Sequence, residues 1–166
     1  MYHKFSGNKR IILILYVDDT LLATNDKEIL HETKKFLSKK FDMKDLGEAS
    51  FVLGIQIYQD RSWGILVLSQ KAYIEKVLER YGMQDCKPGE TPVTKGNKFS
   101  LSQYPKNDLE VKKIQKIPYA SAVRSLIYAQ VCIRPDIAFI VGMLGRYLSN
   151  PGMDHWRAAK RVFIYL

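Results

Sequence analysis

Two adjacent carboxylates, Asp18 and Asp19, are the residues whose types and placement best suit chemistry. They lie between two short apolar runs, residues 11–15 and 21–23. Such runs are typical of strands buried on both faces, and the polar break between them predicts a hairpin. Unpaired buried charge is strongly disfavoured, so neighbouring carboxylates beside a hydrophobic sheet favour a hard divalent cation such as Mg²⁺ or Mn²⁺. A plain turn, in which each Asp bonds to the local backbone, is the alternative.

The composition limits the class of protein. The chain has 166 residues, of which 46% are hydrophobic, enough to bury a core. Its formal charge of +9 favours an anionic partner such as nucleic acid. Cys86 and Cys132 have neither metal-ligand spacing nor a disulfide pattern, which fits a reducing compartment. No apolar run could span a bilayer and no signal-peptide cleavage site is present, so we expect an intracellular, cytoplasmic protein with no membrane partner.

The first half of the chain predicts strands around one helix. Residues 1–9 are expected to form a connecting turn, with no partner strand before the hairpin. Asn25 and Glu28 have the spacing of a capping box, and apolar residues at helical spacing predict a helix over 27–41. Further along, FVLGIQIY predicts one strand with a glycine in its middle, followed by a turn at 60–64 and a partner strand.

The second half is mostly helical. A helix over 70–81 is expected to be capped by Ser69 and ended by Gly82. Residues 83–117 are rich in proline, glycine and lysine without a sustained period, and predict a linker or a partly disordered excursion. Three helices are then expected, over 119–133, over 136–148 and from 154 onward.

The YVDD string between two apolar strands resembles the catalytic hairpin of reverse transcriptases, specifically those of copia-type LTR retrotransposons. The likeness extends through KKFDMKDLGEASFVLGIQI, LSQKAYIEKVLERYGM, YASAVRSLIYA, RPDIAF and LSNPGMDHWRAAKR. It implies an α+β fold in which a partial polymerase palm, made of antiparallel hairpins plus a helix, precedes a helical thumb-like region. The implied divisions are palm over 1–68, thumb-like region over 69–150 with its loop at 83–117, and the start of a connection segment over 151–166.

The resemblance also implies the chemistry of the carboxylates. Asp18 and Asp19 would be catalytic and would bind Mg²⁺ or Mn²⁺ for two-metal nucleotidyl transfer, with dNTP and an RNA or DNA template–primer as partners. Family members supply a third carboxylate from an earlier strand, but residues 1–9 contain no Asp or Glu. We therefore expect a fragment that lacks the N-terminal palm and fingers and the C-terminal RNase H. Alone it would be inactive, whereas its parent would act in a virus-like particle.

Further roles follow from the resemblance for residues that could contact the primer. Tyr16 and Val17 would pack near the primer terminus, although plain core filling is the alternative. Leu53 and Gly54 match the primer grip, where a close approach of the backbone to the primer explains the glycine, and a simple bulge is the alternative. Lys44 lies where related polymerases carry a lysine that protonates pyrophosphate, and a surface lysine before a turn is equally consistent.

Two positions depart from the family pattern in the thumb-like helices. Arg124 replaces a common glycine, so that a long cation either contacts phosphate or disrupts close packing. Ile133 stands where threonine is usual. Such drift is expected of a decaying element.

Two other functions compete with polymerisation. A phospho-acceptor receiver domain also has a strand ending in two acids, and Asp60 could accept the phosphoryl group. Such a domain, however, needs a helix where residues 21–23 form a second strand. The other alternative is a non-catalytic remnant that binds nucleic acid through its basic surface. Three scattered histidines have no metal-ligand spacing, and His155 is expected to cap a helix and fill the core.

Overall fold

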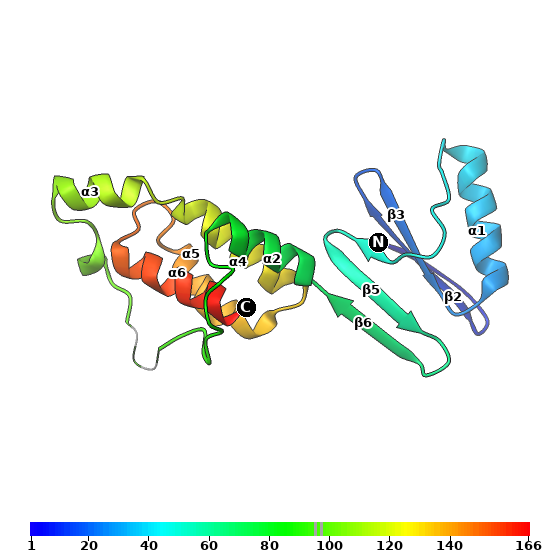
Figure 1. Cartoon of the computed structure of the whole chain (residues 1–166). Helices are drawn as coiled ribbons and strands as arrows, with labels where there is room; N and C mark the ends of the chain where they lie inside the picture. The colour runs from blue at the N-terminus through cyan, green and yellow to red at the C-terminus, as the bar shows by residue number, and fades with distance from the viewer. Residues whose placement is uncertain (95, 97) are drawn as a thin grey trace. The chain divides into compact units, whose positions relative to one another are not determined.

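The computed structural model describes residues 1–94, 96 and 98–166, without the side chain of Leu101. The chain divides into two compact units, Met1–Ser50 and Phe51–Leu166. The described residues form two separate antiparallel sheets of three strands each, together with the helices labelled in Figure 1. The α+β fold class is therefore confirmed. Within the same residues, no helix is both long and apolar enough to cross a lipid bilayer.

The first unit is a three-stranded sheet with one helix. Strands β1 (Tyr2–Ser6), β2 (Lys9–Tyr16) and β3 (Asp19–Thr24) lie in this order, and helix α1 (Lys27–Lys40) follows. The prediction that no strand pairs before the hairpin is wrong, because β1 pairs with β2 from Ser6 opposite Lys9 to Tyr2 opposite Leu13. The pairing is possible because Gly7, at φ 61°, closes a two-residue loop.

Helix α1 packs on one face of this sheet only. Ile11 of β2 and Ile29 of α1 are buried, at 4% and 5% exposure. The alternating positions Ile12 and Ile14 point to the opposite face and remain 38% exposed. The prediction that these strands are buried on both faces is therefore wrong within this unit. An apolar run alone does not reveal how many faces of a sheet are covered.

The N-cap of α1 is Asp26, not Asn25 as predicted. The Asp26 carboxylate accepts the N–H of Ile29 at 3.0 Å, and this hydrogen bond, more than any other interaction, lowers the pKa of Asp26. Asn25 instead accepts the backbone N–H of Arg10 at 2.8 Å. Because that bond ties the start of the helix to the sheet, the tertiary structure decides which of two good capping residues caps the helix.

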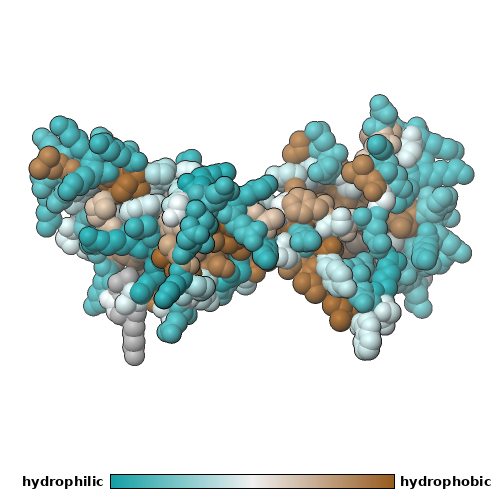
Figure 2. Space-filling model, viewed as in Figure 1, coloured by the Kyte–Doolittle hydropathy of each residue, from teal (hydrophilic) through white to brown (hydrophobic). Residues whose placement is uncertain are grey.

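The second unit begins with the other sheet, made of β4 (Phe51–Val52), β5 (Ile55–Asp60) and β6 (Ile65–Ser69). The single strand predicted over 51–58 is wrong, because Leu53 and Gly54 form a two-residue turn between β4 and β5. Their φ angles of 50° and 74° are incompatible with a continuous strand. The predicted turn at 60–64 and its following strand are confirmed. Figure 2 shows apolar side chains at the surface along β6.

Helices make up the rest of this unit. Helix α2 (Lys71–Arg80) ends before Gly82 as expected. Its N-cap residue is Gln70 and not Ser69 as predicted, although the Ser69 hydroxyl accepts the N–H of Lys71 at 3.2 Å. The stretch 83–117, predicted to be a linker without helices, contains η1 (Leu101–Gln103) and α3 (Asp108–Gln115), so this prediction is wrong. Residues 95 and 97 of the stretch lie outside the described residues. The last helices match the predicted order and are α4 (Tyr119–Cys132), η2 (Pro135–Ile137), α5 (Ala138–Gly145) and α6 (Met153–Tyr165).

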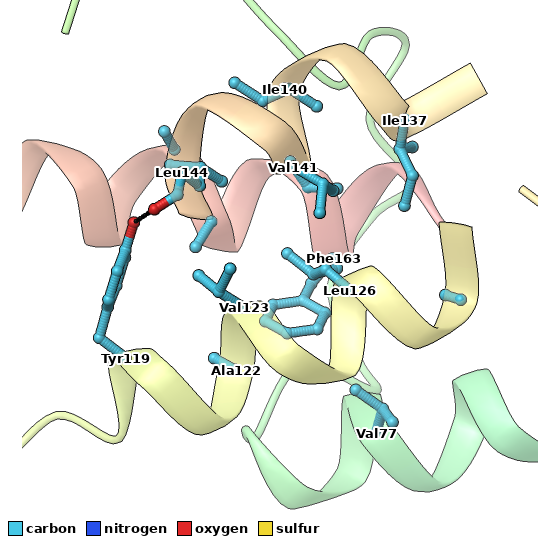
Figure 3. Packing of buried hydrophobic residues seen from close by; sticks show 14 of the residues in the cluster. Val77, Tyr119, Ala122, Val123, Leu126, Ile137, Ile140, Val141, Leu144 and Phe163 are labelled. Carbon is cyan, nitrogen blue, oxygen red and sulfur yellow. Dashed lines mark hydrogen bonds between the residues drawn. The ribbon is translucent and has the colours of Figure 1, made fainter. Parts of the chain in front are cut away.

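The main hydrophobic core lies among α2, α4, α5 and α6 (Figure 3). Small residues such as Ala122 and Ala129 bring α4 close to its neighbours, and Leu126 and Phe163 fill the centre. Tyr119 donates its buried hydroxyl to the carbonyl of Leu144 at 2.9 Å, which satisfies a polar atom that would otherwise be costly to bury. Its burial raises the pKa of the Tyr119 phenol. This core holds these four helices together.

Candidate active site

The predicted carboxylate hairpin is confirmed as a two-residue turn between β2 and β3. Tyr16 and Asp19 form the last cross-strand pair, so Val17 and Asp18 make the turn. Val17 has φ 51°, as the first central position of a type II′ turn requires. A β-branched residue is strained there, at a cost of order 1–3 kcal/mol. Strain of this kind is concentrated at functional sites, and here it lies directly beside the two carboxylates.

Both carboxylates are exposed and available as ligands. Neither side chain accepts a hydrogen bond or an ion pair from another described residue. The prediction that they lie at a buried edge is therefore wrong within the first unit, where residues 16–19 are all exposed. Adjacent carboxylate oxygens still form a donor set that suits Mg²⁺ or Mn²⁺. Among the described residues, however, no group of three or more His, Cys, Asp or Glu could hold a metal ion.

The turn also presents two apolar side chains beside the carboxylates. Tyr16 is 56% exposed and Val17 is 80% exposed. Neither side chain therefore fills the core of the first unit, so the alternative role of core filling is wrong within this unit. An exposed aromatic ring and an exposed aliphatic side chain next to two acids give the tip both a contact surface and a ligand set.

The β4–β5 turn is the second strained tip. Leu53 and Gly54 both have positive φ, as a type I′ turn requires, and glycine is favoured there. The hydroxyl of Tyr128, on α4, donates to the carbonyl of Leu53. A Cβ added at Gly54 would lie 3.4 Å from the same hydroxyl oxygen. The positive φ thus explains Gly54 within this unit, and the side chain that contacts its turn is Tyr128, a residue that sequence reasoning did not identify.

The remaining predicted site residues lie on exposed surfaces. Lys44 belongs to the irregular segment after α1 in the first unit. Arg124 lies on the exposed side of α4 in the second unit, between buried Val123 and Ser125. Because the Arg124 side chain is exposed, it does not disrupt close packing within this unit, and that alternative is wrong. Ile133 is the C-cap residue of α4, and its N–H reaches the carbonyl of Ala129 at 3.3 Å.

The receiver-domain alternative does not fit the structure. Asp60 ends a strand at a hairpin turn, where its carboxylate accepts the N–H groups of Ser62 and Trp63 at 2.9 Å and 3.2 Å. These hydrogen bonds and one from the Ser62 hydroxyl, which is the largest cause, lower the pKa of Asp60. In the described part of the chain, the strand pairs are antiparallel and β2 runs into β3 rather than into a helix.

His155 has the structural role predicted for it. Its Nδ1 accepts the N–H of Gly152 at 2.8 Å at the start of α6, and its ring stacks on Tyr147. The side chain is buried, and burial lowers the pKa of the imidazole. It has no connection to a metal site among the described residues.

Comparison with known proteins gives a consistent result. The family model described as reverse transcriptase (RNA-dependent DNA polymerase) matches residues 1–95. A retrovirus-related Pol polyprotein from transposon TNT 1-94 of Nicotiana tabacum is 48% identical over 165 residues, which cover 99% of this chain and 12% of the relative. The corresponding polyprotein from transposon RE1 of Arabidopsis thaliana is 34% identical over 96% of this chain and 10% of its own length.

A shorter relative extends over the whole chain. A putative transposon Ty5-1 protein of Saccharomyces cerevisiae is 32% identical over 100% of this chain and 52% of its own length. No solved structure matches the chain significantly. The chain spans about a tenth of the length of the Pol polyproteins it matches. Since the family match includes both strained turns and both carboxylates, this chain belongs to the reverse transcriptase (RNA-dependent DNA polymerase) family, in the form carried by retrotransposon Pol polyproteins.

Proposed function

We propose that this chain supplies the carboxylate turn of an RNA-directed DNA polymerase, which copies a retrotransposon template by two-metal nucleotidyl transfer. The observation that carries the proposal is the turn itself: Asp18 and Asp19 project from a strained hairpin tip with their oxygens free of other described partners. The family match over residues 1–95 supports it. Divalent cations bound there would lower the pKa of the primer 3′-hydroxyl and balance charge on the triphosphate.

The chain's own residues would then position the reactants. Tyr16 and Val17 would contact the primer terminus, because they are the exposed apolar side chains nearest the carboxylates in sequence. Leu53 and Gly54 would act as the primer grip. Their turn is attached to α4 by the hydrogen bond from the Tyr128 hydroxyl to the Leu53 carbonyl. Lys44 is proposed as the acid that protonates pyrophosphate.

We propose a division into palm and thumb whose boundary differs from that between the two compact units, Met1–Ser50 and Phe51–Leu166. We assign the palm to residues 1–68 and the thumb-like region to residues 69–150, with residues 151–166 beginning a connection segment. Support comes from the sheets, which end at Ser69, and from the helices that follow. Arg124, exposed on α4, would contact template–primer phosphate.

A chimera tests the proposed chemistry. This chain would replace the matching 165 residues of the tobacco Pol polyprotein, and primer extension on an RNA template would be measured. We expect activity, and a loss of more than about a hundredfold in Asp18→Asn, because even outer partners of metal sites contribute 10–100-fold. Asp42→Asn removes an exposed acid of the same unit and is the matched control. Equal activity in all three proteins would refute the proposal.

The polypeptide of residues 1–166 is proposed to be inactive alone, because two adjacent carboxylates do not complete a two-metal site. Primer extension on poly(rA) by the purified polypeptide, abolished by Asp18→Asn, would contradict this.

A non-catalytic role in nucleic-acid binding is the second candidate function, favoured by the charge of +9.

A further inference from the structure

The second unit has a basic pocket that no role described above uses. It is open to solvent, has a volume of about 520 Å³, and lies between helix α6 and the segment 89–91. Three cations of α6 line one side, and Gly89, Glu90 and Thr91 line the other, with Ile164 also in the wall. The cations are Arg157, Lys160 and Arg161.

The folding of α6 explains why these cations face outward together. Ala158, Ala159, Val162 and Phe163 are buried in the core. The positions 157, 160, 161 and 164 follow one helical stripe on the other side, since residues three and four apart are neighbours on a helix. The core therefore fixes the direction in which all three cations point.

The opposite wall of the pocket is attached to the same helix. The N–H of Gly89 donates to the carbonyl of Ile164 at 2.9 Å. A Cβ added at Gly89 would lie 3.5 Å from Ile164 Cγ2, so the segment packs against α6 at ordinary van der Waals distance. Arg161 also donates to the hydroxyl of Thr94, further along this segment. The pocket is thus built from two connected walls rather than from a loose loop.

The charge balance of the lining favours an anion. Three cations face one carboxylate, Glu90. Asp154 pairs with Arg157 at 2.7 Å, but both groups of this pair are largely exposed, so that it is weak and easily exchanged. Lys160 forms no ion pair within the described residues. Guanidinium groups bind phosphate oxygens in a bidentate manner, and a nearby ammonium adds a mobile charge.

We infer that Arg157, Lys160 and Arg161 bind backbone phosphates of nucleic acid in this pocket. The inference rests on the proposed function, to which it adds a binding surface on α6. Nucleic acid is favoured over an acidic peptide because successive phosphates present fully ionised oxygens at regular intervals, which suits cations repeated along one helical stripe.

The test measures binding of a short fluorescein-labelled RNA–DNA hybrid to the full chain over a range of KCl concentrations. The triple variant Arg157→Gln, Lys160→Gln, Arg161→Gln should weaken binding by about tenfold or more at low salt and reduce the salt slope by roughly 2–3. The matched control removes three charges from the same unit at exposed Lys112, Lys113 and Lys116. Circular dichroism checks that both triple variants remain folded.

The outcomes separate the inference from the proposed function. If the unaltered chain binds the hybrid and both triple variants lose the same affinity, binding follows net charge and the pocket is refuted while the proposed function stands. If the unaltered chain binds no hybrid at low salt, nucleic-acid binding by this chain fails as well. Binding of a poly-glutamate peptide as tightly as the hybrid would also overturn the inference, because it would indicate a general site for acidic chains.

Discussion

At the scale of single residues, Val17 shows how the carboxylate turn differs from an ordinary hairpin tip. A type II′ turn is normally closed by glycine, but here a β-branched residue adopts φ 51°. Strained residues persist where the surrounding structure holds them, which is common where geometry serves function. Val17, whose β-branched side chain favours extended backbone, thus occupies the turn position directly before Asp18 and Asp19.

Replacing Val17 by Asn should stabilise the chain. Asn tolerates positive φ and adds no glycine entropy cost, so we expect the free energy of unfolding to rise by about 1 kcal/mol. Urea unfolding measures the change. Val67→Asn, at a β6 residue with ordinary strand geometry and 46% exposure, is the control and should not stabilise. A destabilised Val17→Asn variant would show that the turn is not strained.

His155 gives a pH-dependence that can be checked. Burial lowers its pKa in the folded state below the unfolded value of about 6.5. The unfolded chain therefore binds the proton more readily than the folded chain. Titration of His155 costs no stability above about pH 6.5, and the free energy of unfolding decreases as the pH falls toward the lowered pKa. Asn at this position keeps an acceptor for the N–H of Gly152 without titrating.

Between about pH 7 and pH 5, a range that includes the unfolded pKa, we expect the urea midpoint of the unaltered chain to fall more steeply than that of His155→Asn. The variant should be less stable at neutral pH, because it loses the stacked contact with Tyr147. Exposed His3 and His31 are present in both proteins, so the difference between the curves isolates His155. Parallel curves would contradict the assignment.

At the scale of elements, the attachment of the β4–β5 turn to α4 depends on Tyr128. Removing its hydroxyl in Tyr128→Phe leaves the Leu53 carbonyl without this donor, and should cost about 1 kcal/mol. Hydrogen exchange at Gly54 and Ile55 should become faster than in Tyr58→Phe, which removes the hydroxyl of an exposed tyrosine of β5. Equal exchange rates in the two variants would show that Tyr128 does not hold the turn.

The elements also show what periodicity can and cannot predict. The hairpin around Asp18 and Asp19, the helix after it and the three last helices followed from apolar spacing and from breaks at Pro and Gly. The turn at Leu53–Gly54 could not be predicted in this way, because leucine gives no signal for positive φ and the flanking residues continue the strand pattern. Helix α3 was missed because it is short, although Asn107 and Glu110 form a capping pair that indicates its start.

The candidate site was only partly predictable for a related reason. The types and spacing of Asp18 and Asp19 identified the turn, but their exposure depends on which face of the sheet α1 covers, and this is a tertiary property. The role of Tyr128 depends on a contact between residues 75 positions apart in the chain. No local pattern encodes such a contact.

At the scale of the whole molecule, the two units differ in how much core each contains. The buried hydrophobic residues of Met1–Ser50 are Ile11 and Ile29, whereas the core cluster of the described chain lies within Phe51–Leu166. Apolar surface removed from water is the main favourable term in folding, at about 25 cal/mol per Å². A sheet with one open apolar face therefore has little to offset the conformational entropy of its strands.

The polypeptide of residues 51–166 should consequently fold without the first unit. We expect it to unfold cooperatively in urea, with a midpoint close to that of the full chain's main transition, while residues 1–50 alone should show no cooperative transition. Circular dichroism and tryptophan fluorescence of Trp156, which packs against the core cluster, follow the second unit. If residues 51–166 were unfolded alone, or residues 1–50 folded alone, stability would not follow the distribution of buried residues.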